Sequence, residues 1–265
     1  MSNSQTGTRT WQDVPQKLYK FRSLDGPGRE HALDIISNSR MYWPAPVSFN
    51  DPFDCAPVAV FEGSPLKKAA YVRKVVRTYA SGASKADRRR IISSALSRPV
   101  EEIEANMAEL HQELRRQVGV CSLTARCDHI LMWAHYAASH RGFCLEFSTR
   151  TYDPHFLLAF PVFYSASRPQ IDMISKRSED LLEQVFLHKA DFWSYEEEWR
   201  MLDQRAGPGL HTFPSEALTG IIIGAEMPAA DELLLRECIR KSGRELKLMK
   251  ARLDNRLFHL HIEPA

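Results

Sequence analysis

The stretch from Val118 to Phe147 reads VGVCSLTARCDHILMWAHYAASHRGFCLEF, and it decides the fold class of the chain. Its first seven residues are apolar and β-prone, residues 128–140 have helical character, and residues 142–147 are β-prone again. Strands that lie this near one another in sequence favour a mixed α+β sheet over a doubly wound parallel sheet.

The same alternation continues on both sides of this stretch. Before it, we expect a strand at 17–22, a helix at about 29–39, extended chain at 41–47 because of Pro44 and Pro46, and a structured loop at 48–54. After it, we expect strands at 159–164, 195–202, 220–224, 246–249 and 258–262, and helices at 179–190 and 228–241. The first strand and helix lack the GxGxxG sequence of a Rossmann domain. The pattern therefore predicts a mixed, mainly antiparallel sheet.

Residues 65–117 differ in character, with many charges, few aromatic residues and helical periodicity. We interpret them as two or three helices inserted into a single α+β domain that covers residues 15–265, after a flexible leader at 1–14. Within the insertion, Lys85 to Arg90 carries four basic residues and one acid, and we interpret this run as a solvated helix face.

The charge balance limits the functional classes. Lys plus Arg number 35 and Asp plus Glu number 33, which argues against a nucleic-acid coat protein but does not exclude a local basic groove. No run approaches the roughly 20 apolar residues of a membrane helix, and residues 1–10 lack the hydrophobic core of a signal peptide. The five cysteines include no CxxC pair. We therefore expect a cytoplasmic protein with reduced thiols and no membrane partner.

The acidic run at residues 195–200, YEEEWR, is the first candidate site. On a strand, Glu196, Glu198 and Arg200 would share one face, because alternate residues point the same way. Two carboxylates about 7 Å apart beside a guanidinium make a pocket wall, and the aromatic residues around them favour a ligand cleft. The alternative is a solvated sheet face with a cross-strand salt bridge.

The loop Asn50-Asp51-Pro52-Phe53-Asp54 is a second candidate. It either forms an Asx-type turn, in which Asn50 or Asp51 bonds the backbone, or shapes a cleft faced by Ser48 or an acid. Arg22 ends the first strand, where it either binds an anion or pairs with an acid such as Asp54.

The histidines do not predict a metal site. His135 and His140 are five residues apart, which places them on different faces of a helix, and the nearby cysteines have no zinc spacing. A neutral histidine that holds a backbone group at a helix end is the simpler interpretation. Cys144 lies mid-strand and is most simply a small buried apolar residue.

Four motifs together resemble a bacterial family annotated only as a domain of unknown function. The motifs, which span residues 18–200, are Leu18-Tyr19-Lys20-Phe21-Arg22, Phe49-Asn50-Asp51-Pro52-Phe53-Asp54, Trp133-Ala134-His135-Tyr136 with His140 and Gly142-Phe143-Cys144, and Trp193-x-Tyr195-Glu196-x-Glu198-Trp199-Arg200. This resemblance implies no reaction.

A second resemblance does imply a reaction. An arginine on a first strand, a serine after a second strand and a later Glu-x-Glu are similar to the arginine–serine–glutamate ADP-ribosyltransferases. That resemblance implies that Arg22 binds the phosphates of NAD and that Ser48 steadies the nicotinamide ribose. It also implies that Glu198 bonds the ribose hydroxyl and that Glu196 orients or deprotonates the acceptor. The further residues expected around NAD are Tyr19, Phe49, Asn50, Asp51, His135, Tyr136 and Trp199.

The leading hypothesis is thus an NAD-consuming ADP-ribosyltransferase that modifies a protein or nucleic acid, in a toxin or anti-phage role. One alternative is a metal-dependent nuclease or phosphoesterase, whose Mg²⁺ ligands would be Asp51, Asp54, Glu196 and Glu198, with Lys189 near the scissile phosphate. Another is a non-enzymatic module that binds a nucleotide or peptide. The transferase hypothesis requires Arg22, Ser48 and Glu198 to converge on one cleft.

Overall fold

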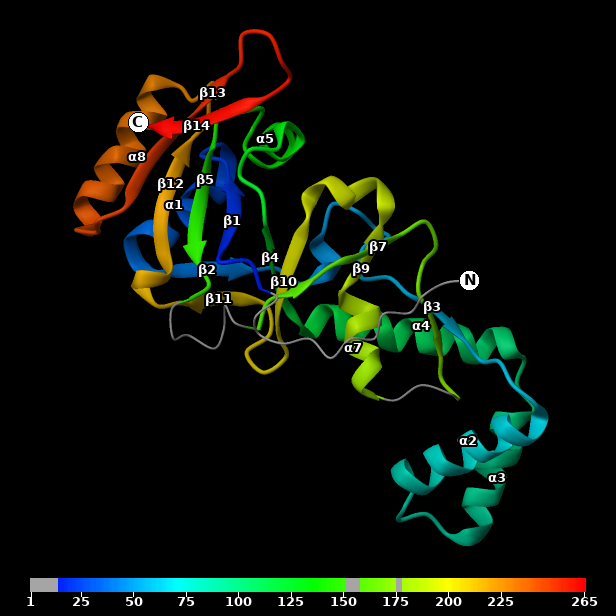
Figure 1. Ribbon diagram of the computed structural model, residues 1–265. Helices are drawn as coiled ribbons and strands as arrows, with labels where there is room; N and C mark the ends of the chain where they lie inside the picture. The colour runs from blue at the N-terminus through cyan, green and yellow to red at the C-terminus, as the bar shows by residue number, and fades with distance from the viewer. Residues whose placement is uncertain (1–13, 151–157, 175–177) are drawn as a thin grey trace. The chain divides into compact units, whose positions relative to one another are not determined.

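The computed structural model describes residues 14–150, 158–174 and 178–265, and the chain divides into two compact units (Figure 1). The sheet unit comprises the described residues of Met1–Ala45, Val118–Val162 and Phe192–Ala265, and the helical unit comprises those of Pro46–Gln117 and Phe163–Asp191. The leader expected at 1–14 lies outside the described residues except for Val14. The insertion predicted at 65–117 falls within the helical unit.

The sheet unit is built on a mixed, mainly antiparallel sheet, as the sequence predicts. Among the described residues, eight strands form it in the order β14-β13-β12-β5-β1-β4-β10-β6. Their bounds are β1 Lys17–Arg22, β4 Gly119–Thr124, β5 Phe143–Ser148, β6 Phe160–Pro161, β10 Glu198–Asp203, β12 Leu218–Ile223, β13 Lys247–Leu253 and β14 Leu260–Pro264. The pair β12–β13 is parallel and is connected by helix α8, Ala229–Ser242, whereas the other pairs are antiparallel.

The two faces of this sheet bury different side chains. On one face Leu18 and Leu145 pack against Ile36 of helix α1, Arg29–Asn38, in a core that also includes strand β2, Arg40–Trp43. On the other face Phe21 meets the ring of Trp133 edge-on at 5.0 Å, and Trp133 belongs to helix α5, Ile130–Tyr136. We call these the α1 face and the α5 face. Because successive side chains of a strand point to opposite sides, each residue of β1 belongs either to the α1 face or to the α5 face.

Helix α5 is shorter than the helix predicted at 128–140. Ala138, Ser139 and His140 all have left-handed backbone, with φ of 47°, 56° and 67°, so the helix cannot continue through them. The chain then passes through Gly142, where a Cβ atom would lie 2.1 Å from the carbonyl oxygen of Arg22. The prediction failed here because this close approach to β1, which requires glycine, is a tertiary contact that helical periodicity does not report.

The strand predicted at 195–202 is also partly wrong. Residues Asp191–Glu196 form a 3-10 helix, η4, and β10 begins only at Glu198. Between them Glu197 has a φ of 42°. The left-handed residue breaks the strand alternation, so Glu196 does not share a strand face with Glu198. The helix predicted at 179–190 is likewise split into α7, Ser178–Phe186, and strand β9, His188–Ala190.

The helical unit holds the predicted insertion as three helices: α2 Pro65–Tyr79, α3 Lys85–Leu96 and α4 Val100–Gln117. The side chains of Ser64 and Ser84 accept hydrogen bonds from the backbone N–H groups of Lys67 and Asp87, which caps the first two helices. Short strands complete the unit in two parallel pairs, β3 Val58–Val60 with β8 Gln170–Asp172 and β7 Phe163–Ser165 with β9.

The remaining short elements are the 3-10 helices η2 Gly26–Gly28, η3 Pro46–Ser48 and η5 Ser215–Ala217, and the strand β11 Gly209–Thr212, which pairs with β2. Among the described helices, none combines the length and apolarity needed to cross a membrane.

Candidate functional site

Strand register fixes where the predicted acid of β10 points. Tyr19 of β1 lies opposite Thr124 of β4, and Thr124 in turn lies opposite Glu198 of β10. Residues directly opposite on paired strands share a face. Since Phe21, two residues after Tyr19, contacts Trp133 of α5, Glu198 projects from the α5 face.

Glu198 and Arg200 form a buried ion pair on that face. The Nε and NH2 groups of Arg200 donate to the two carboxylate oxygens of Glu198, at 2.7 and 2.9 Å. The Arg200 side chain is 0% exposed and that of Glu198 is 5% exposed. Such a two-point grip is the strong, geometrically specific form of this pairing. The prediction that these two residues share a strand face is confirmed.

Arg22 projects from the other face. It lies opposite Phe143 and two residues beyond Lys20, and Phe143 belongs to the core on the α1 face. Desolvation lowers the pKa of the Arg22 guanidinium. Strand alternation thus assigns Arg22 and Glu198 to different faces, and burial raises the pKa of Cys121, which the charge of Arg22 lowers and that of Glu198 raises.

Lys20 shares the α1 face with Arg22 and is 8% exposed. Its ammonium donates to the carbonyl oxygen of Ser122 at 2.6 Å. The pKa of Lys20 is lowered to about 8, mainly by burial; the charge of Arg22 acts in the same direction, and Cys121 and Glu198 oppose the shift. The buried cations Lys20 and Arg22 of β1 therefore both belong to the α1 face, and Lys20 is near enough to Glu198 for that charge to act on it.

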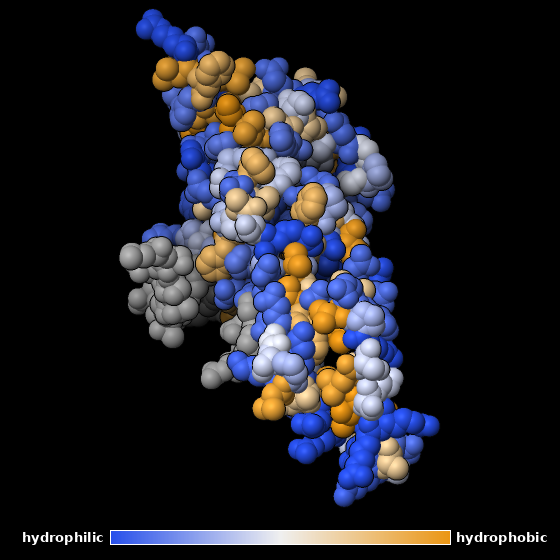
Figure 2. Space-filling model, turned by 90° about the vertical axis from the view of Figure 1, so that its right-hand side faces the viewer, coloured by the Kyte–Doolittle hydropathy of each residue, from blue (hydrophilic) through white to orange (hydrophobic). Residues whose placement is uncertain are grey.

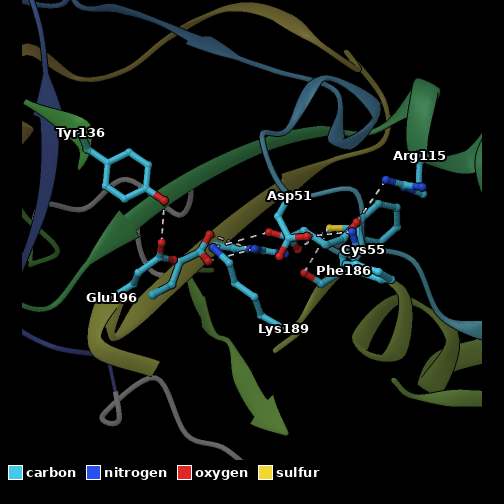
Figure 3. A network of polar contacts seen from close by, with 11 residues as sticks. Asp51, Cys55, Arg115, Tyr136, Phe186, Lys189 and Glu196 are labelled. Carbon is cyan, nitrogen blue, oxygen red and sulfur yellow. Dashed lines mark hydrogen bonds and ion pairs between the residues drawn. The ribbon is translucent and has the colours of Figure 1, made fainter. Parts of the chain in front are cut away.

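Glu196, the last residue of η4, is held by two contacts within the sheet unit. The hydroxyl of Tyr136 donates to Glu196 Oε1 at 2.6 Å, and Figure 3 shows the tyrosine pointing at this carboxylate. The Thr124 hydroxyl donates to the Glu196 carbonyl at 2.5 Å. Only 3% of Glu196 is exposed. An acid from η4 and a phenol from α5, sixty residues apart, thus meet on the α5 face.

Aromatic and histidine rings gather beside this acid. His129 stacks on Tyr195 with ring centroids 5.3 Å apart, and His135 lies 6.1 Å from Tyr195 and 6.4 Å from Trp193. Tyr195 Oη and His135 Nδ1 are hydrogen-bonded at 3.3 Å. We call His129, His135, Trp193 and Tyr195 the aromatic–histidine cluster. Burial lowers the pKa of His129, and the neighbouring Arg126 lowers it further.

A charged rim adjoins the cluster. Arg126 donates to Asp128 at 3.0 Å and forms an ion pair of 3.5 Å with Glu197, the left-handed residue. The hydrogen bond from Arg126 lowers the pKa of Asp128, and that bond likewise raises the pKa of Arg126. Arg126 and Asp128 therefore each stabilise the charged form of the other.

Trp199 is not part of this surface. It packs against the core on the α1 face, opposite to the side that Glu198 faces. Tyr195 instead packs on the α5 side, so it does not share a face with Trp199 as alternate residues of one strand would. The left-handed Glu197 between them is the physical reason.

The remaining predicted residues belong to the helical unit. Ser48 ends η3, and the Phe49 N–H donates to Pro46 O at 3.1 Å. Asp51 Oδ1 accepts from the Phe53 N–H at 2.8 Å, which is the geometry of an Asx-type turn, and Asn50 is exposed. The loop thus contains the Asx-type turn that was one of its two predicted forms.

Asp54 is the charged centre of that loop. Lys189 Nζ lies 3.5 Å from Asp54 Oδ2, with side chains 7% and 3% exposed, and Arg115 donates to the Asp54 carbonyl at 3.1 Å. The adjacent Cys55 donates to Phe186 O at 3.9 Å (Figure 3). Lys189 therefore neutralises a buried carboxylate.

The predicted Mg²⁺ ligands are divided between the two units: Glu196 and Glu198 belong to the sheet unit, and Asp51 and Asp54 to the helical unit. Within residues 14–150, 158–174 and 178–265, no three His, Cys, Asp or Glu side chains are placed to hold one ion. Asp54 is paired with Lys189, and Glu198 with Arg200. No observation favours the metal-dependent nuclease.

Comparison with known proteins gives a family match over part of the chain. A family model described as a protein of unknown function (DUF2971) matches residues 132–201, which run from α5 through β5 and η4 into β10. No curated protein and no solved structure matches the chain. The match covers Tyr136, Glu196 and three members of the aromatic–histidine cluster.

Sequence reasoning found most of these residues but not their pairing. It named Tyr136 and Glu196 separately, and nothing in the sequence links two residues sixty positions apart. It missed Arg126, whose only signal in the sequence was its position two residues before the acid Asp128. It also missed Glu146, which accepts hydrogen bonds from Lys17 and Thr219 at 2.9 Å each.

Proposed function

We propose that the sheet unit binds NAD at the aromatic–histidine cluster and that the chain is an ADP-ribosyltransferase-like enzyme. The observation that carries this proposal is the hydrogen bond from Tyr136 to Glu196, because it places a buried acid directly beside that cluster. A planar nicotinamide ring is a suitable partner for stacked aromatic side chains. The resemblance to arginine–serine–glutamate transferases supplies the reaction.

In the proposed reaction the bond between the nicotinamide nitrogen and ribose C1′ breaks, and the nicotinamide leaves with the bonding electron pair. The sugar acquires oxocarbenium character, which a nearby carboxylate stabilises. A nucleophile of the acceptor, either a protein or nucleic-acid group or water, then bonds C1′ and loses its proton.

The geometry changes the roles that the resemblance implies. We assign the sugar-facing carboxylate to Glu196, since the charge of Glu198 is already compensated by Arg200. Arg22 has no part in the proposal because it projects from the α1 face. Ser48 belongs to the helical unit and also has no part. Because Glu196 is 3% exposed, the side chains above it must move when the dinucleotide enters.

An NAD-consuming activity would deplete the cell of a central cofactor or modify a target irreversibly. Either outcome suits a toxin or an anti-phage protein, which is the role that we propose. Water can serve as the acceptor in an assay, so the protein or nucleic acid that is modified does not need to be identified first.

The test measures release of nicotinamide from NAD by the full chain. We expect Glu196→Gln to abolish release, because the amide keeps an acceptor for Tyr136 but removes the charge. The matched control is Glu197→Gln, which changes the adjacent exposed acid and should retain turnover. Trp193→Leu should weaken NAD binding, measured by the shift in melting temperature.

Wild-type protein that neither binds NAD nor releases nicotinamide would contradict the proposal. Binding without any turnover would instead favour the non-enzymatic nucleotide-binding module. Equal turnover in Glu196→Gln and Glu197→Gln would remove Glu196 from the mechanism.

A further inference from the structure

The helical hairpin of α2 and α3 concentrates positive charge. Residues 65–98 contain ten basic residues, five in α2, four in α3 and Arg98, against one acid, Asp87. The rest of the chain holds 25 basic and 32 acidic residues. The nearly neutral net charge of the chain is therefore the sum of a strongly basic hairpin and an acidic remainder.

The basic side chains of α2 line a hollow. Arg73, Lys74 and Arg77 surround a depression of about 300 Å³, together with Ala70 and Thr78. All three cations are exposed, and within the described part of the chain none of the three forms an ion pair with a carboxylate. Unpaired cations around a hollow attract an anionic ligand without first having to break a salt bridge.

Helix α8 provides a contrast. There Arg236 pairs with Glu232, and Arg240 and Lys241 both pair with Glu237. Basic residues on a helix of this chain can therefore have carboxylate partners, and the three cations of α2 differ from those of α8 in this respect.

The opposite side of α2 is already used for packing. Val72 and Val76 are buried and pack with Phe61 and Ile92 in the core of the hairpin. The buried apolar side chains of α2 therefore belong to the hairpin core, whereas Leu66 and Tyr79 at the two ends of the helix are exposed. Figure 2 shows hydrophilic side chains interspersed with hydrophobic ones over the end of the molecule that these two helices form.

The spacing suits a phosphate backbone. Arg73 and Arg77 are one helical turn apart, a rise of about 6 Å, which is close to the rise of two nucleotides along one strand, about 7 Å. Guanidinium groups bind phosphate oxygens in a two-point fashion. We propose that the α2–α3 hairpin binds the phosphate backbone of a nucleic acid without sequence preference. This proposal does not rest on the proposed function.

The experiment uses the full chain and a fluorescently labelled, random-sequence DNA duplex, with anisotropy recorded between about 50 and 200 mM salt. The variant is Arg73→Gln, Lys74→Gln, Arg77→Gln. The matched control is Arg236→Gln, Arg240→Gln, Lys241→Gln, which removes the same number of cations from α8. Circular dichroism confirms that both variants fold.

We expect the α2 variant to bind about tenfold or more weakly at low salt. The slope of log affinity against log salt should fall by about three, one for each phosphate contact removed. The control should retain the wild-type slope. Failure of the wild-type chain to bind the duplex, equal loss in both variants, or binding to phosphatidylserine vesicles but not to the duplex would each overturn the proposal.

Discussion

Lys20 offers a direct test of the sheet geometry, because its charge is enclosed on the α1 face of the central strand β1. The perturbation is Lys20→Met, which keeps a long unbranched side chain and removes the ammonium. The wild-type lysine is 8% exposed, and its protein hydrogen bond goes to the Ser122 carbonyl. The variant therefore changes the charge while leaving the packing volume nearly constant.

The magnitude follows from the pKa. Lowering the pKa of Lys20 from its ordinary 10.5 to about 8 means that the folded state disfavours the ammonium form by about 3 kcal/mol. The folded pKa is the lower one, so between the two values the unfolded chain binds more protons and stability rises with pH. We expect wild type to gain about 2 kcal/mol relative to Lys20→Met between about pH 8 and about pH 10.

The assay is urea unfolding of both proteins at several pH values in that window. Other groups also titrate there, including Tyr19, Cys121 and Cys144, whose pKa values burial raises, so the difference between the two curves is the quantity to use. The exposed Lys17→Met serves as the control and should follow wild type. Parallel curves for wild type and Lys20→Met would refute the burial of a charged lysine on this face.

Three further changes test the packing. Arg200→Met should cost about 3–5 kcal/mol in urea unfolding, because it leaves the carboxylate of Glu198 buried without its main cation; a loss below about 1 kcal/mol would contradict this. Gly142→Ala should cost at least about 2 kcal/mol by the same measurement, since its Cβ would meet the carbonyl of Arg22 at 2.1 Å. Ser64→Ala removes the N-cap of α2 and should cost about 1 kcal/mol, seen as lower helix protection in hydrogen exchange.

The Gly142→Ala change has a control at a second glycine. Gly28→Ala places its Cβ where no atom lies within 4 Å, so it should leave stability nearly unchanged if the effect at Gly142 is steric. A comparable loss at both glycines would point instead to a general effect of substituting glycine.

The sequence by itself determined the local elements and the class of fold. Alternation at β1 and apolar or β-prone runs at β4, β5 and β12 predicted strands, and helical patterns predicted α1, α8 and the helical insertion. These signals are local, because each reports which side chains of a short segment can share one buried face. They were enough to predict the mixed α+β sheet.

Only the tertiary structure decided which of the candidate residues meet. Whether Arg22 and Glu198 share a face depends on how β1, β4 and β10 are paired, and that register comes from contacts between distant segments. A single left-handed residue, Glu197, removed Glu196 from the strand and brought it to Tyr136. The sequence of a strand determines which of its side chains point to the same side. Which face of the sheet that side becomes, and which side chains of other strands share it, depends on how all the strands pair and pack.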